Sequence, residues 1–225
     1  QLEIALGVAP SDLTAAEQGE LLFYDANLSL DGWYSCHSCH TDGHTNGLLV
    51  DNLGDESFGS PKRVLTLLGV RNTAPWAWNG KIEKLSVQTQ KSIIATMQGK
   101  TPNPEQVQAL TEYLQQLPPP PTDAHSLPEQ KVEKGRLLFH SHGCSRCHRS
   151  PTFTSPGRYD VGLVDHLGLR RYSPPSLRGV GFGRLFFHDN QATSLRNVFV
   201  KHRHGLVDPL TDQQLDELLT FLRSL

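Results

Sequence analysis

The sequence has no long apolar run and almost no net charge. None of its 225 residues lies in an apolar stretch of 18 or more, so we predict no membrane-spanning helix. Gln1 does not open a basic segment followed by an apolar one, and we therefore expect a mature or trimmed chain whose export signal has been removed. The 21 Lys and Arg nearly balance the 23 Asp and Glu, which argues against a nucleic-acid-binding protein.

The small net charge conceals an imbalance between the two halves of the chain. Residues 1–121 carry 7 Lys and Arg against 13 Asp and Glu, a net charge of −6, whereas residues 122–225 carry 14 against 10, a net charge of +4. Ordinary solvated surface explains such a difference, and so does an attraction between the halves or the orientation of a charged partner. The sequence leaves these interpretations open.

Cysteine is scarce, yet all four cysteines fall into two copies of one pattern, Cys-x-x-Cys-His. The copies are residues 36–40 (CHSCH) and 144–148 (CSRCH). Two thiols three positions apart on a helical turn can bond to the two vinyl groups of one haem, and the adjacent histidine can then bind the iron. The pattern predicts two covalently bound haems c, attached through Cys36 and Cys39 and through Cys144 and Cys147, with His40 and His148 as proximal iron ligands.

Two other chemistries use paired cysteines. A thioredoxin-like redox pair requires a βαβ context, which this sequence lacks. A zinc site would require the two Cys-x-x-Cys pairs to share one metal ion. Covalent haem attachment normally takes place outside the cytoplasm, so we expect a bacterial protein that is periplasmic or exported.

The chain contains two copies of one unit. The second haem motif follows the first by 108 residues, and residues 106–117 (QVQALTEYLQQL) match residues 214–225 (QLDELLTFLRSL) at the same spacing. Residues 78–80 match residues 188–190 at a spacing of 110.

This duplication and the few strand signals predict an all-α protein with two tandem cytochrome c-like domains, each wrapped around one haem. The first domain covers residues 1–117 and the second covers residues 126–225. Residues 118–125 form a linker between them, because four consecutive prolines cannot continue a helix and favour an extended form.

Both copies contain helix-start signals, in which a side-chain oxygen can accept a hydrogen bond from the first helical turn. They are Thr14 with Glu17, Asn103 with Pro104, Ser126 with Glu129, and Thr211 with Gln214.

The ligand on the second face of each iron determines what a haem can do, because two strong protein ligands favour electron transfer and an open position favours reaction with peroxide or oxygen. The first copy contains the only methionine, Met97, which we predict to be a distal ligand although a lone Met usually fills a core. The equivalent stretch of the second copy, residues 198–205, contains His202 and His204 instead. These lie two positions apart and point to different faces of a helix, so only one of them should reach the iron.

The chain resembles the bacterial dihaem cytochrome c peroxidase and MauG superfamily over nearly its whole length. Besides the haem motifs, the resemblance rests on residues 71–81 (RNTAPWAWNGK), 175–180 (PSLRGV), 187–189 (FHD) and 210–225. It implies two cytochrome c-like domains packed face to face, with Trp78 as the aromatic bridge between the haems. It also implies a calcium ion at the domain junction, held by the side chain of Asn72 and by the carbonyls of Ser173 and Pro175.

The resemblance also bears on the iron ligands and on activity. In the family, the distal ligand of the second domain follows a leucine by seven residues, and counting from Leu195 favours His202 over His204. The family's peroxidases use a glutamate in the stretch that matches residues 85–98, but this chain has no acidic residue there and offers Met97. Peroxide cleavage needs a positioned acid or base to move a proton between the two oxygens.

These features predict a dihaem c-type cytochrome that transfers electrons, with His/Met ligation at the first haem and bis-histidine ligation at the second. The alternative is an enzyme of the cytochrome c peroxidase or MauG type, in which one iron opens to hydrogen peroxide. The expected partner is a redox protein, or a fused catalytic domain, that donates or accepts electrons. No nucleic acid is expected as a partner.

Overall fold

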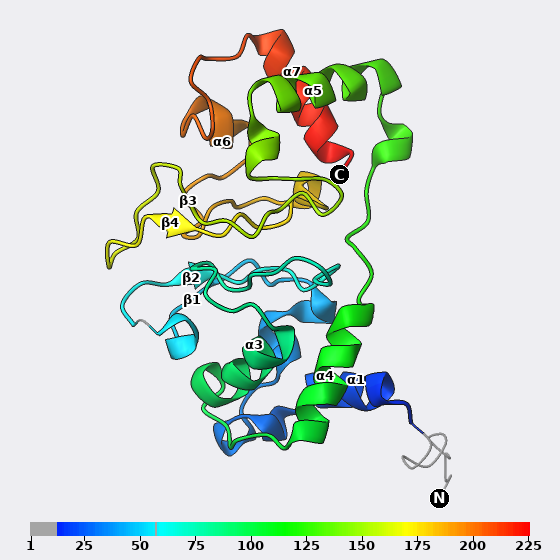
Figure 1. Cartoon of the computed structure of the whole chain (residues 1–225), viewed down its shortest axis with the longest axis vertical. Coiled ribbons are helices and arrows are strands. Elements are labelled where there is room, and N and C mark those ends of the chain that lie inside the picture. The colour runs from blue at the N-terminus through cyan, green and yellow to red at the C-terminus, as the bar shows by residue number, and fades with distance from the viewer. Residues whose placement is uncertain (1–12, 57) are drawn as a thin grey trace, which may run out of the picture.

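The structure is a computed structural model that describes residues 13–56 and 58–225. Helices dominate this part of the chain, and its strands are only two residues long (Figure 1). The α-helices are α1 (Ala15–Tyr24), α2 (Cys36–Cys39), α3 (Leu85–Lys91), α4 (Pro104–Gln116), α5 (Glu129–Ser141), α6 (Leu195–Val200) and α7 (Asp212–Arg223). Antiparallel strand pairs are β1 (Leu49–Val50) with β2 (Lys62–Arg63), and β3 (Tyr159–Asp160) with β4 (Arg171–Tyr172).

Short helical turns connect these elements. A π-helical turn (Ser92–Thr96) extends α3. The 3-10 turns are Ala26–Leu28, Leu30–Gly32, Thr41–Gly43, Leu53–Asp55, Ala124–Ser126, Cys144–Arg146 and Val180–Phe182. Within the described residues, no helix has both the length and the apolar character that crossing a bilayer requires.

The predicted helix starts at Thr14, Asn103 and Thr211 are confirmed, and each forms a complete capping box. The predicted start at Ser126 is wrong. Helix α5 begins at Glu129 with Pro128 as its N-cap, while the Ser126 hydroxyl donates to the carbonyl of Asp123 in the preceding 3-10 turn. Ser126 is therefore already used in a local turn, and the fixed φ of Pro128 suits the start of the helix.

One pair of long helices packs together in each half of the chain, α1 with α4 and α5 with α7. A glycine lies at each crossing. A Cβ atom on Gly19 would lie 2.0 Å from the carbonyl oxygen of Ala109, and one on Gly135 would lie 2.1 Å from that of Glu217. Such distances are far below van der Waals contact, so the helices approach this closely only because both positions lack a side chain.

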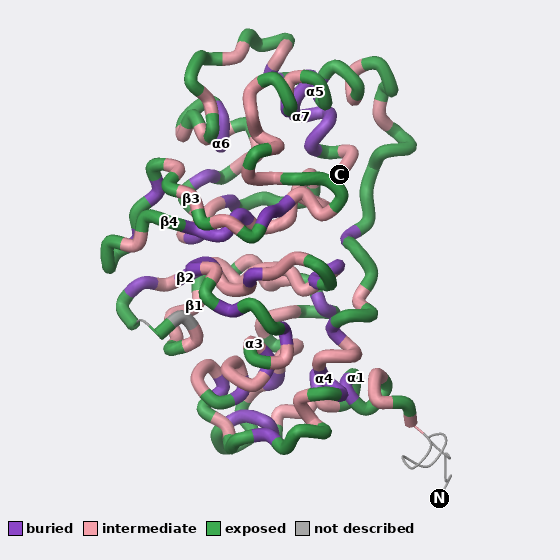
Figure 2. The backbone as a smooth tube through the Cα atoms, viewed as in Figure 1, coloured by how far each residue is buried: buried purple, intermediate pink, exposed green. Residues whose placement is uncertain are grey.

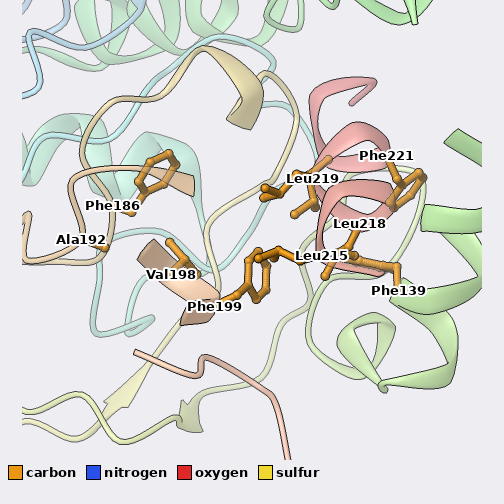
Figure 3. Packing of buried hydrophobic residues seen from close by; sticks show 10 residues of the cluster. Phe139, Phe186, Ala192, Val198, Phe199, Leu215, Leu218, Leu219 and Phe221 are labelled. Carbon is orange, nitrogen blue, oxygen red and sulfur yellow. The ribbon is translucent and has the colours of Figure 1, made fainter. Parts of the chain in front are cut away.

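Each helix pair contributes to its own buried cluster. In the first half, Phe23 of α1 and Leu110 of α4 are almost completely buried. In the second half, Phe139 of α5 packs with Leu218 and Phe221 of α7 (Figure 3). Figure 2 shows buried residues along these helices and also in the loop layer between the two halves.

The two halves meet through this layer of loops and short strands, which lies between the two sets of helices (Figure 1). The N–H of Arg63 donates to the carbonyl of His188 at 2.6 Å, and the N–H of Ser173 donates to the carbonyl of Trp78 at 2.9 Å. Ser173 follows Arg63, and His188 follows Trp78, by the same 110 residues that separate the copies. Equivalent residues thus make the same hydrogen bond in both directions, as in an isologous interface.

Other contacts fix this junction. The Lys62 ammonium lies 2.9 Å from a carboxylate oxygen of Asp165, and both side chains are buried. Alongside the linker, the Arg178 guanidinium donates to the carbonyl of Gly69, and Pro120 is buried against Gly179. The linker is therefore packed against both halves.

Candidate haem sites

Both Cys-x-x-Cys-His motifs form a helical turn, as predicted. The first forms α2 and the second forms the 3-10 turn Cys144–Arg146. In each, the N–H of the histidine donates to the carbonyl of the first cysteine at 2.9 Å, which closes the turn at His40 and at His148. A helical turn of this kind presents residues three positions apart on one face, where both thiols can reach one macrocycle.

None of the four cysteines forms a disulfide with another. Burial raises the pKa of Cys36 to about 11 and also raises the pKa values of Cys39, Cys144 and Cys147. Across residues 13–56 and 58–225, no three His, Cys, Asp or Glu side chains gather where one metal ion could bind them. The two pairs are therefore not brought together, as a shared zinc site would require.

A cavity of about 310 Å³ opens beside the first motif and is lined by Cys36, Cys39 and His40. Residues 173–176 of the second half also line it, so this cavity reaches the junction. Burial lowers the pKa of His40, which favours the neutral imidazole that binds iron. The thiols, the imidazole and the cavity fit one covalently attached haem, called haem 1 below.

The second motif positions its histidine by a hydrogen bond. His148 Nδ1 lies 3.0 Å from the carbonyl oxygen of Phe153, and a ring nitrogen that faces a carbonyl must carry the proton. This leaves Nε2 as a lone-pair donor, the arrangement typical of a histidine that ligates a metal. Burial lowers the pKa of His148 to about 4, so the ring is neutral. These groups fit a second attached haem, called haem 2 below.

The rings of His204 and His148 lie near each other, at an interplanar angle of 62°. Their ring centroids are 6.5 Å apart. A metal–imidazole bond of roughly 2 Å puts the centroids of two rings on opposite sides of one metal about 6 Å apart. The spacing of this pair therefore matches two axial ligands of a single iron.

His202 lies two residues before His204 in the same loop. The ring of Phe187 contacts both His202, at 5.2 Å between centroids, and His204, at 5.4 Å. His202 Nε2, the nitrogen that would bind iron, is buried and has no hydrogen-bond partner. Because α6 ends at Val200, both histidines lie beyond the helix, where the helical-face argument no longer applies.

Met97 is a core residue beside the first cavity. It is 3% exposed and belongs to the cluster that contains Phe23 and Leu110. Its Sδ atom lies 3.9 Å from Cys36 Sγ. Met97 also lines the first cavity, and its role as a distal ligand stays a prediction.

Two residues that the sequence did not single out also line the first cavity. Trp76 Nε1 and Gln88 Oε1 are buried and have no hydrogen-bond partner. No Asp or Glu among the described residues lines this cavity. The backbone turns at Ala77, which has a φ of 62°, so alternation along the sequence gave no signal for Trp76.

Trp78 lies at the junction, where its indole N–H donates to the carbonyl of Arg63 at 2.8 Å. Its ring meets the rings of Tyr172 and His188 edge-on, both at 6.3 Å between centroids. Tyr172 and His188 stack at 4.6 Å, and His188 is 1% exposed. The junction thus has a continuous aromatic cluster to which both halves contribute.

The residues predicted to hold calcium belong to two segments, one in each half of the chain, that are joined by a hydrogen bond. The Ser173 hydroxyl donates to the carbonyl of Pro75 at 3.3 Å, and Pro175 lines the first cavity. Asn72 is exposed, with a φ of 64°. Calcium at these residues stays a prediction.

The chain is similar to proteins of known family. Residues 14–120 match the family model for di-haem cytochrome c peroxidase. Hydrazine synthase subunit gamma of Kuenenia stuttgartiensis is 26% identical, and the match covers 92% of this chain and 76% of that protein. Cytochrome c551 peroxidase of Nitrosomonas europaea is 22% identical, with 97% of this chain and 81% of that protein covered.

A solved structure of the Kuenenia stuttgartiensis hydrazine synthase has the same fold, with a TM-score of 0.81 and 21% identity over 100% of this chain and 98% of that one. The arrangement of helices therefore agrees with that of a known protein along the whole chain. The two haem motifs, the family model over residues 14–120 and these relatives support a place in the dihaem cytochrome c peroxidase and MauG superfamily.

Proposed function

We propose that this protein is a dihaem c-type cytochrome that passes electrons between redox partners, with each half wrapped as a cytochrome c-like domain around one haem. The observation that carries the proposal is the spacing of His148 and His204, which suits two axial ligands of haem 2. An iron with two imidazole ligands has no open position and favours electron transfer. A periplasmic or exported location is part of this proposal.

Each group of residues would have a separate role in this function. When bound, each haem supplies an iron centre that takes up and gives back one electron. Cys36 and Cys39 hold haem 1 and His40 binds its iron, while Cys144, Cys147, His148 and His204 serve haem 2. Trp78 lies between the two halves and offers an aromatic route between the centres.

This proposal revises both distal ligands suggested by the sequence. We assign His204, rather than His202, to haem 2, because the ring centroids of His204 and His148 are 6.5 Å apart. We assign no sulfur ligand to haem 1, because Met97 contacts Cys36 at the rim of the cavity.

A second candidate function follows from the same cavity. Without Met97 as a ligand, the iron of haem 1 would keep an open position, in a cavity where the Trp76 indole N–H and the Gln88 amide oxygen have no hydrogen-bond partner. Such an iron could react with hydrogen peroxide, as in a cytochrome c peroxidase or MauG-type enzyme. Electron transfer is favoured because the lining contains no carboxylate to move the proton that peroxide cleavage requires.

Spectroscopy of the holoprotein separates the two functions. Absorption and EPR spectra would be recorded for the oxidised and half-reduced protein, before and after addition of hydrogen peroxide. If the protein transfers electrons, peroxide should leave its spectra unchanged. The same protein should be reduced and reoxidised many times by a redox partner. Rapid, stoichiometric oxidation of the haems by peroxide would overturn our choice in favour of the enzyme.

The ligand of haem 2 is tested with a matched pair of variants. His204→Ala should convert the low-spin signal of haem 2 to high spin, because one axial imidazole is lost. His202→Ala is the control and should leave that signal unchanged. The opposite result in the two variants would return the assignment to His202.

A further inference from the structure

Two cations line the first cavity where it reaches the second half of the chain. They are Lys62 and Arg63 of β2, a strand in the layer between the two halves (Figure 1). No other Lys or Arg among the described residues lines this cavity. Lys62 has Asp165 as its counter-ion, with 2.9 Å between the ammonium nitrogen and a carboxylate oxygen. The charge of Lys62 is thus balanced within the chain.

Arg63 has no such counter-ion. Its Nε donates to the carbonyl oxygen of Phe187 at 3.2 Å, and this acceptor is neutral. Among the side chains that the structure describes, no carboxylate pairs with the guanidinium and none lines the cavity. Burial lowers the pKa of Arg63 because it disfavours the charged form, yet a guanidinium stays protonated in proteins. A buried charge of this kind is costly unless an anion accompanies it.

The junction holds Arg63 in place. Its backbone N–H donates to the carbonyl of His188 at 2.6 Å, and its own carbonyl accepts the indole N–H of Trp78 at 2.8 Å. The guanidinium carbon lies 5.7 Å from the centroid of the Trp78 ring, within the range of a cation–π interaction. None of the described residues accepts a hydrogen bond from the Nη groups of Arg63. The guanidinium is therefore fixed on its Nε side and has donors left for another acceptor.

The cavity joins this arginine to the attachment point of haem 1. Cys36 and Cys39 line it on the side of the first half, where Cys36 packs against the buried cluster of α1 and α4. Arg63 and residues 173–176 line it at the junction. A haem carries its propionate carboxylates on the edge opposite the vinyl groups, and the vinyl groups are the ones that cysteines bind. Attachment at Cys36 and Cys39 therefore favours a position of the propionates toward the junction.

We propose that the guanidinium of Arg63 binds a propionate carboxylate of haem 1 through its Nη groups, and that its positive charge raises the reduction potential of this haem. The planar N–H fork of an arginine matches the two oxygens of a carboxylate. A positive charge near the macrocycle favours the reduced iron, which carries one positive charge fewer than the oxidised iron. This binding requires the attachment of haem 1 proposed above, and it holds whether that haem carries electrons or reacts with peroxide.

The second copy has no arginine at the equivalent position. At the 110-residue spacing, Ser173 corresponds to Arg63, and the Ser173 hydroxyl donates to the carbonyl of Pro75 at 3.3 Å. The lining of the first cavity includes none of residues 144–148, which form the second haem motif. The charge of Arg63 should therefore act on haem 1 more than on haem 2, and haem 2 can serve as an internal reference.

Redox titration of the holoprotein at neutral pH tests this effect without a partner protein or peroxide. The reduction of each haem would be followed by its absorption and EPR signals in the unmodified protein and in Arg63→Gln. The control is Arg71→Gln, which removes the same charge from an exposed side chain of the same half that does not line the cavity. Resonance Raman spectra of the propionate bending modes would be recorded for the same proteins.

In Arg63→Gln, the equilibrium constant for reduction of haem 1 should fall at least about tenfold, which corresponds to a decrease of about 59 mV in its potential. Haem 2 in the same variant, and haem 1 in Arg71→Gln, should change by less than about threefold. The propionate modes of haem 1 should shift in Arg63→Gln and stay unchanged in Arg71→Gln. An unchanged potential of haem 1, equal changes at both haems, or unshifted propionate modes would overturn the proposal.

Arg63→Lys keeps the positive charge and removes the planar fork. It should keep the equilibrium constant for reduction of haem 1 within about threefold of that of the unmodified protein, while the propionate modes still shift. This variant also decides the matter if Arg63→Gln fails to fold with both haems. A tenfold fall in Arg63→Lys would overturn the proposal, because the charge would then have no effect on the potential.

Mass spectrometry of the unmodified protein counts the attached haems and separates this proposal from the proposed function. A chain with haem on the second motif alone would overturn the proposed function together with the role of Arg63. Two attached haems and no effect of Arg63→Gln would overturn only the role of Arg63.

Discussion

Met97 and Cys36 meet through their sulfur atoms, and this contact gives Met97 a packing role. Met97→Leu keeps the volume and apolar character of the side chain, so it should change the free energy of unfolding by less than about 1.5 kcal/mol. Met97→Ala should destabilise the protein by about 2–5 kcal/mol, because it leaves a cavity in the first cluster. Chemical denaturation of both holo variants measures the difference.

The same variants report on iron ligation. On the proposed assignment, in which Met97 packs beside Cys36 and does not bind iron, neither variant should alter the near-infrared absorption or the EPR spectrum of haem 1. Loss of a sulfur-to-iron band in Met97→Leu would show that the sulfur is an axial ligand after all.

At the residue scale, the sequence predicted the haem-attachment residues because their chemistry depends on spacing within five positions. The distal residues depend on where the chain goes after a helix ends. Beyond Val200 the backbone folds back, with Arg203 at a φ of 48° and the N–H of His204 bonded to the carbonyl of Val198. Neither helical periodicity nor counting from Leu195 describes such a turn, so the choice between His202 and His204 as the ligand of haem 2 could not be derived from either.

The close helix crossings give a prediction at the scale of elements. Ala has a higher helix propensity than Gly by about 1 kcal/mol, so Gly135→Ala should stabilise an isolated helix. In the protein it should instead lower the stability by about 1–3 kcal/mol, because the new Cβ would press on the carbonyl of Glu217.

Thermal unfolding of the holoprotein measures this effect. Gln130→Ala, at an exposed position of the same helix, is the control and should stay within about 0.5 kcal/mol of the unmodified protein. If Gly135→Ala were as stable as this control, α5 and α7 could move apart without losing stability. The tight packing of their crossing would then be contradicted.

Helix starts show which local features the sequence can predict. Thr14, Asn103 and Thr211 each have their capping partner three residues later, and the predicted capping boxes form. Ser126 had the same spacing to Glu129, but the intervening Pro128 supplies a better helix start and the serine hydroxyl bonds backward. The close crossings at Gly19 and Gly135 could not be predicted, because a glycine within a helix does not reveal what packs against it.

The junction supplies the prediction for the whole molecule. Burial would raise the pKa of Asp165, but the Lys62 ammonium and the N–H groups of Leu169 and Leu167 outweigh it and lower this pKa to about 2. The usual value in an unfolded chain is about 3.9. The Asp165 carboxylate therefore stabilises the folded state fully above about pH 4, and this contribution is lost as the pH falls through about 2.

Asp165→Asn should destabilise the protein by about 3–5 kcal/mol at neutral pH, because it removes the negative charge that faces the buried Lys62 ammonium. Its stability should then fall less steeply between pH 4 and pH 2, as measured by acid unfolding followed by circular dichroism. The exposed Asp208→Asn is the control and should keep the original profile. An unchanged slope in Asp165→Asn would contradict the role of this pair.

At the scale of the whole molecule, the 110-residue spacing showed which positions correspond but not that they face one another. Trp78 and His188 are equivalent in sequence, and their rings meet edge-on at the junction. The contact between these two rings depends on how the two copies pack against each other. That packing is determined by residues over the whole surface of each copy, and not by a local pattern.

The reciprocal hydrogen bonds of Arg63 and Ser173 relate the two copies symmetrically, but the side chains around them are not symmetric. Lys62 pairs with Asp165 across the junction, whereas Tyr172, the counterpart of Lys62 at the 110-residue spacing, carries no ammonium group. This buried charge pair therefore gives the junction a polarity that its backbone bonds lack, because the first copy supplies the cation and the second copy supplies the anion.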